Sequence, residues 1–132
     1  MSNLSQLSVD DDALQVCIQD SGNEMEARTI AWSNINTGSW NVDGLKTMAP
    51  LIADAFSSLE ADVRLDESPP FEAVTPEGTV DAIYTGPIIR IGARPEAPVQ
   101  IICSGHYDTV FPPGTFEGVK VLGSGRLNGP GL

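Results

Sequence analysis

The sequence is poor in basic residues, and this shortage argues against two classes of partner. Its 132 residues include 7 lysines and arginines against 18 acidic residues, which gives a formal net charge of −11. Nucleic acids and anionic membranes are bound through clustered Lys and Arg, so neither is an expected partner. No stretch approaches the ~18 apolar residues of a membrane span, so no transmembrane helix is expected.

Cysteines are also scarce, and Cys17 and Cys103 have a spacing that fits neither a zinc ribbon nor a redox pair. We expect Cys17 in a helix and Cys103 in a buried strand, where a free cysteine behaves as a small apolar side chain. Residues 1–12 contain no basic region followed by an apolar run. No signal peptide is therefore expected, and the cytoplasm is the default location. The length predicts one domain at most.

The first part of the chain has a helical but imperfect spacing of apolar residues. Over residues 10–35 these residues fall loosely on one face, and residues 21–23 interrupt the pattern. This predicts two helices, or one helix broken near Gly22. Ser8 or Asp10 is placed to cap the first turn.

The clearest helix begins at Asn41 or Asp43 and extends to about Glu60. Its apolar residues recur at three- and four-residue steps, which gives one apolar stripe. Pro50 lies inside this stretch and lacks a backbone donor. It predicts either a bend or a late start of the helix near Ala49.

Short apolar or alternating runs, separated by turn residues, predict strands at residues 61–65, 72–74, 79–83, 87–91, 99–103 and 119–122. The second and third of these are expected to form a hairpin. A short connection favours antiparallel pairing of residues 88–91 with 99–102. Because the apolar residues of 99–103 do not alternate with polar ones, this strand is expected to be buried on both faces. Helices followed by a mixed sheet define an α/β fold class.

His106 and Asp108 directly follow the strand expected at residues 99–103. Ligands of open α/β sheets bind beyond the carboxyl ends of the strands, and residues two apart in an extended chain point the same way. A carboxylate beside an imidazole accepts its second N–H and raises its basicity as a metal ligand. The pair predicts a metal-binding histidine oriented by an aspartate. A hydrogen-bonded structural histidine is the alternative.

The segment around this pair reads G-H-Y-D-T-V-F-P at residues 105–112, and L-N-G-P-G-L follows at residues 127–132. Together the two segments resemble the M20 family of zinc-dependent peptidases and deacylases, and among them carboxypeptidase G2-like and acetylornithine deacetylase-like hydrolases. Residues 35–39, I-N-T-G-S, stand where family members read I-x-S-x-S. The resemblance implies that His106 binds one zinc ion and that Asp108 orients this histidine.

The resemblance further implies that residues 1–132 are the amino-terminal part of a zinc-peptidase-like α/β catalytic domain. In the family, a glycine-rich segment leads to an aspartate that bridges two zinc ions. That aspartate, the catalytic glutamates and the lid or dimerisation domain are expected outside this sequence. Family members use two zinc ions, for which other divalent metals such as cobalt can substitute. Their substrates are small molecules: amino-acid amides, N-acyl amino acids or peptides. The resemblance is also compatible with a homodimer of the full-length protein.

Two interpretations remain open at this point. In the first, the chain is part of a zinc-dependent hydrolase that cleaves amide or peptide-like bonds. In the second, it is a non-catalytic relic, or a small binding module, that keeps the first layers of the fold. Glu117 is expected to be a surface residue and not a further ligand.

We predict that the rigorously purified 132-residue protein has no zinc-dependent amidase activity. A catalytic zinc has three protein ligands and a water, which His106 and Asp108 cannot supply alone. Assays of N-acyl amino acid and dipeptide hydrolysis, with and without added zinc, test this. Turnover that requires metal and is lost in His106→Ala would contradict it.

Overall fold

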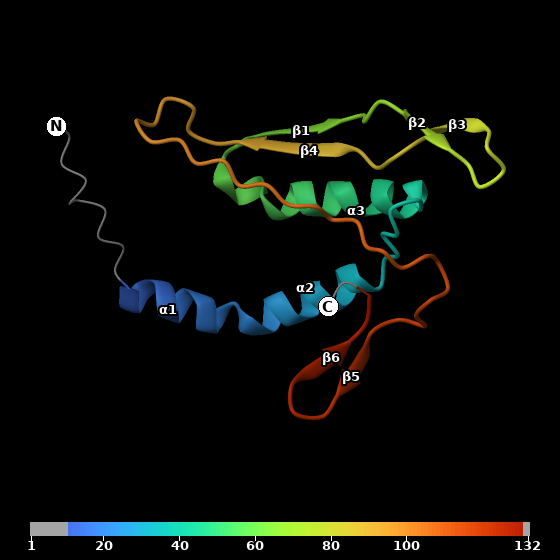
Figure 1. Cartoon of the computed structure of the whole chain (residues 1–132). Helices are drawn as coiled ribbons and strands as arrows, with labels where there is room; N and C mark the ends of the chain where they lie inside the picture. Colours follow the sequence, from blue (N-terminus) through green and yellow to red (C-terminus); the bar gives the residue numbers. More distant parts are fainter. Residues whose placement is uncertain (1–10, 131–132) are drawn as a thin grey trace. The chain divides into compact units, whose positions relative to one another are not determined.

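The computed structural model describes residues 11–130 (Figure 1). These residues form two compact units, which divide between Trp32 and Ser33. Ser8 and Asp10, the expected helix caps, lie outside the described residues. No helix in the described part of the chain is long and apolar enough to cross a membrane.

The first unit is helical, as its sequence predicts. Helix α1 (Asp11–Asp20) and helix α2 (Gly22–Ser33) are separated at Ser21, which confirms a break near Gly22. On α2, the Arg28 guanidinium lies 2.6 Å from Glu24 one turn earlier. It also lies 5.9 Å from the ring centre of Trp32 one turn later. Helix α2 has no buried residue, so it gains no stability from packing in a core. The contacts of Arg28 with its neighbours on the same helix face stabilise it locally instead.

Helix α3 (Val42–Ala55) begins where its sequence predicts. Asn41 caps it by accepting a hydrogen bond from the Gly44 N–H at 3.3 Å. Pro50 lies within the helix with its ring exposed, and the late start near Ala49 is therefore wrong. The buried side of α3 carries Leu45, Met48 and Ala49. A short 3₁₀ helix, η2 (Ser57–Leu59), follows.

Helix α3 packs on a two-stranded antiparallel sheet formed by β1 (Asp62–Asp66) and β4 (Ile88–Gly92). In this register Leu65 stands opposite Ile89, and Arg64 stands opposite Arg90. Directly opposite like charges repel. Each guanidinium has a carboxylate beside it: Asp62 lies 2.7 Å from Arg64, and Asp66 lies 2.9 Å from Arg90.

Two hairpins complete the described chain. Strands β2 (Phe71–Val74) and β3 (Val80–Ile83) pair around a tight turn in which Gly78 has a φ of 83°, and this confirms the predicted hairpin. Strands β5 (Lys120–Leu122) and β6 (Arg126–Asn128) form the other hairpin. The sequence predicted β5 but not β6, because three residues beside a glycine-proline segment carry too little alternation to indicate a strand.

The largest error of the sequence interpretation concerns residues 99–103, which are neither a strand nor buried. Ile101 is 82% exposed, Ile102 is 94% exposed, and Cys103 is also exposed. Strand β4 pairs with β1 and not with residues 99–102. Apolar residues favour burial, but a strand also requires a pairing partner. The short connection in sequence predicted residues 88–91 as that partner, and this prediction is wrong.

The fold class is mixed α/β, as predicted, but the described residues form no single mixed sheet. They form three separate two-stranded antiparallel sheets, β1–β4, β2–β3 and β5–β6. Parallel pairing occurs at one isolated bridge, between Gly38 and Thr109. There the Thr109 N–H donates to Thr37 O at 2.8 Å, and the Ser39 N–H donates to Thr109 O at 3.0 Å.

Gly38 is packed against the backbone at this bridge. A Cβ atom at this position would lie 2.5 Å from Phe111 O, so a side chain there forces the two segments apart. We predict that Gly38→Ala lowers the free energy of unfolding by about 1–3 kcal/mol, as overpacked substitutions do. Urea denaturation followed by circular dichroism measures this. Gly92→Ala, at a site with nothing within 4 Å, is the matched control. Equal stability of the two variants would contradict the prediction.

Candidate metal-ligand site

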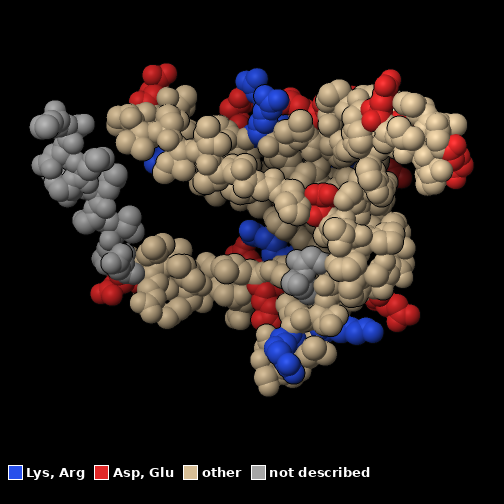
Figure 2. Space-filling model, viewed as in Figure 1, with Lys and Arg blue, Asp and Glu red and all other residues tan. Residues whose placement is uncertain are grey.

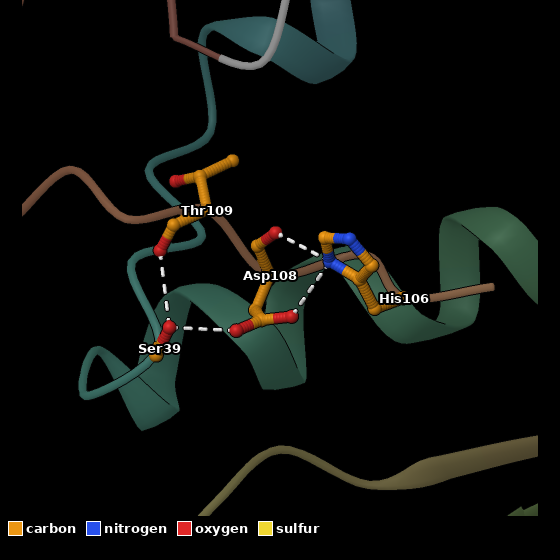
Figure 3. Close-up of polar contacts among 4 residues, drawn as sticks. All are labelled: Ser39, His106, Asp108 and Thr109. Atoms are coloured by element: carbon orange, nitrogen blue, oxygen red, sulfur yellow. Dashed lines mark hydrogen bonds and ion pairs between the residues drawn. The ribbon is translucent and has the colours of Figure 1, made fainter.

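The structure brings His106 and Asp108 together as the sequence predicts. His106 Nδ1 lies 3.0 Å from Asp108 Oδ1 and 3.1 Å from the Asp108 backbone oxygen (Figure 3). A carboxylate and a carbonyl oxygen can only accept, so Nδ1 carries the hydrogen in both contacts. In the neutral ring this leaves Nε2 as the bare nitrogen. The His106 side chain is 85% exposed, so Nε2 is open to a ligand.

Ser39 is a third member of this cluster, and sequence reasoning gave it no role. Its hydroxyl donates to Asp108 Oδ2 at 2.6 Å and lies 3.2 Å from Thr109 O (Figure 3). Asp108 thus uses one carboxylate oxygen for Ser39 and the other for His106. The sequence held one signal for Ser39: its place at the end of residues 35–39, which resemble the segment I-x-S-x-S of the M20 family.

An asparagine pair holds Ser39 in place. Asn36 Nδ2 donates to Phe111 O at 3.1 Å, and Asn36 Oδ1 accepts from the Gly38 N–H at 3.1 Å. Asn41 Nδ2 donates to Asn36 O at 2.9 Å. Because Asn41 is also the cap of α3, one hydrogen-bond network joins the start of this helix to the segment that carries His106 and Asp108.

Tyr107 anchors this segment from its other side. Its hydroxyl donates to Pro87 O at 2.7 Å, just before β4. Gly86 makes this approach possible, since a Cβ there would lie 2.7 Å from the Tyr107 hydroxyl oxygen. Partial burial, and to a lesser degree the Asp108 carboxylate, raise the pKa of the Tyr107 phenol. The phenol therefore stays protonated and keeps donating.

The hydrogen bond from Ser39 holds the pKa of the Asp108 carboxyl below its ordinary value. Desolvation acts in the opposite direction, and the contact with His106 adds to the lowering. The carboxylate form is thus favoured, and this form is the one that can accept the Nδ1 hydrogen of His106.

The described residues offer one candidate metal ligand, His106, and contain no complete metal centre. Across residues 11–130, no three His, Cys, Asp or Glu side chains gather closely enough to hold an ion. Glu117 is exposed, as expected. The described residues therefore match one part of a zinc site, an imidazole ligand with a carboxylate partner. A complete zinc site would need further ligands from outside these residues.

An apolar groove with a volume of about 740 Å³ adjoins this cluster. Its lining includes Leu45 and Ile52 of α3, Ile89 and Ile91 of β4, and residues 103–108. Ser39, His106 and Asp108 thus line a groove large enough for a small organic ligand or a peptide.

Comparisons with protein-family models, with curated proteins and with solved structures find no match to this chain.

We predict that Ser39→Ala raises the pKa of Asp108, because its strongest hydrogen-bond donor is lost. A carboxyl whose pKa is lowered on folding stabilises the protein above its unfolded pKa, and this contribution is lost as the pH falls through the folded pKa. The variant should therefore lose less stability than the parent on acidification. Carbon NMR of the Asp108 carboxyl and urea titrations across the acid range measure both quantities. Ser39→Thr, which keeps a hydroxyl, is the control. An unchanged pKa in Ser39→Ala would contradict the prediction.

Proposed function

We propose that this chain is the histidine-bearing part of a zinc-dependent hydrolase that cleaves amide or peptide-like bonds. The observation that supports this best is the His106–Asp108 pair, with Nδ1 bound by the carboxylate and Nε2 exposed. It is the arrangement that metal-ligating histidines use in proteins. The resemblance of residues 105–112 to the M20 family supports the same class of protein.

Each residue of the cluster has a distinct role in the proposed site. His106 offers Nε2 as one ligand to a zinc ion. Asp108 fixes the ring tautomer and orientation, and increases the electron density on Nε2. Ser39 holds the second carboxylate oxygen of Asp108 and so fixes the plane of the carboxylate. When bound, zinc lowers the pKa of its water toward ~7, which supplies a nucleophile at neutral pH.

The proposed substrates are small amides: amino-acid amides, N-acyl amino acids or peptides. They belong to the proposal because the M20 resemblance implies them. Because no three His, Cys, Asp or Glu side chains gather closely enough to hold an ion among residues 11–130, the proposal places the remaining zinc ligands outside this part of the chain. The two cysteines are free and exposed, which suits a reducing compartment such as the cytoplasm.

A binding module without catalysis is the second candidate function. The groove beside α3 favours it, because this groove is present without any complete catalytic centre in the described part of the chain. The two candidates differ in whether His106 binds metal.

We predict that zinc binds the chain through His106, and that Asp108→Asn weakens this binding about 10–100-fold, as losses of such carboxylate partners do. Zinc titrations followed through the NMR signals of the imidazole measure the affinity, and His106 is the sole histidine of the sequence. Glu117→Gln is the control and should leave the affinity unchanged. Zinc binding that persists in His106→Ala, measured by titration calorimetry because this variant has no imidazole, would contradict the proposed function.

A further inference from the structure

A second pocket, with a volume of about 530 Å³, is formed by helix α3, the loop after β1 and the residues before β4. The polar side chains that line it are Lys46, Glu67, Ser68, Tyr84 and Thr85. Thr85 and Pro87 also line the groove beside His106, whereas Lys46 and Glu67 line only this second pocket. The Lys46–Glu67 pocket is therefore a separate candidate site, and its volume falls in the range of small-molecule sites.

The polar side chains of the Lys46–Glu67 pocket lack partners within the described part of the chain. None of these five side chains forms a hydrogen bond or an ion pair with another described residue. Lys46 and Glu67 thus line one pocket with opposite charges and do not form an ion pair with each other. A ligand that carries both charges can supply the missing partner of each.

The backbone around this pocket is restrained without a ligand. Pro69 and Pro70 restrict the loop after β1, because each proline ring fixes its own φ and confines the preceding residue to extended conformations. Pro87 O accepts the hydrogen bond of the Tyr107 hydroxyl at 2.7 Å, which anchors the segment before β4. Asn41 caps the third element of the pocket, helix α3. A pocket that is already restrained loses little conformational entropy when a ligand binds.

The pocket also contains an uncovered aromatic ring. Tyr84 is 61% exposed and lines the pocket together with the rings of Pro69, Pro70 and Pro87. Neither aromatic pair among the described residues includes Tyr84. An aromatic group of a ligand can pack against this ring in an offset or edge-to-face arrangement.

The two charges of the pocket disfavour ligands of a single sign. An anion would meet the like charge of Glu67, and a cation would meet that of Lys46. Figure 2 shows Lys and Arg side chains in small separate groups on the visible face, so no large basic patch there attracts an anion. The pocket has one carboxylate and no His or Cys, which is too few ligands for a metal ion. A ligand with one ammonium and one carboxylate group matches both charges.

We propose that the Lys46–Glu67 pocket binds an aromatic α-amino acid in its zwitterionic form. The ligand carboxylate pairs with Lys46 Nζ, its ammonium group pairs with the Glu67 carboxylate, and its ring packs against Tyr84. Ser68 and Thr85 supply hydroxyls for the remaining hydrogen bonds of the charged groups. Because Lys46 and Glu67 are exposed, water weakens both ion pairs, and binding is expected in about the millimolar range. The proposal depends on neither zinc nor amide hydrolysis.

The test titrates L-phenylalanine into the full, isotope-labelled chain without added metal, followed by backbone proton–nitrogen NMR. We expect saturable shifts of the amide signals of residues 67–68 and 84–85. Two analogues keep the ring and lack one charge each: phenethylamine has no carboxylate, and hydrocinnamate has no ammonium group. Each should bind at least about threefold more weakly than phenylalanine. A titration without saturable shifts, or equal affinity for the three compounds, overturns the proposal.

Two charge-neutralising variants assign the two ends of the ligand. Lys46→Gln should weaken the binding of phenylalanine and hydrocinnamate about threefold and leave phenethylamine unchanged. Glu67→Gln should weaken phenylalanine and phenethylamine and leave hydrocinnamate unchanged. The matched controls are Lys120→Gln and Glu77→Gln, which change the net charge equally at exposed sites outside the pocket. Equal losses in a control and its matched pocket variant mean a general effect of net charge and overturn the proposal. Shifts confined to residues 103–108 place the ligand in the other groove, and overturn it too.

Discussion

The structure of the larger unit depends on the parallel bridge between Gly38 and Thr109. Two backbone hydrogen bonds, of 2.8 and 3.0 Å, join segments that are about seventy residues apart in sequence. On one side, Asn36 and Asn41 connect this bridge to the start of α3. On the other side, it fixes the chain one residue after Asp108. The bridge therefore sets the distance between Ser39 and Asp108, and through Asp108 the orientation of His106.

Residues 103–108 carry His106 and Asp108 and also line part of the groove. Among the described residues, no backbone-to-backbone hydrogen bond involves residues 99–108, and the bridge at Thr109 holds the segment at its carboxyl end. Ile101 and Ile102 are almost fully exposed, and the His106 side chain is 85% exposed. Both the apolar side chains and the imidazole are therefore accessible from solvent.

Local features were predictable from the sequence, and long-range pairing was not. The break near Gly22, the cap at Asn41 and the hairpin around Gly78 follow from the chemistry of a few adjacent residues, and the structure confirms them. His106 and Asp108 were found because their spacing of two in extended chain brings them together. Ser39 was missed because its contact with Asp108 spans 69 residues and requires the fold. The prediction that residues 99–103 form a buried strand was wrong, because the burial of a strand depends on neighbouring strands that its own residues do not specify.

Asp108 holds His106 with the hydrogen on Nδ1 and a bare Nε2. Long-range proton–nitrogen NMR of the imidazole tests this most directly, since the sequence has one histidine and the spectrum has one ring to assign. For the neutral ring, the account predicts the Nδ1–H form in the parent chain. It also predicts a shift toward the Nε2–H form in Asp108→Asn. A parent spectrum dominated by the Nε2–H form, or one that Asp108→Asn leaves unchanged, would contradict the account.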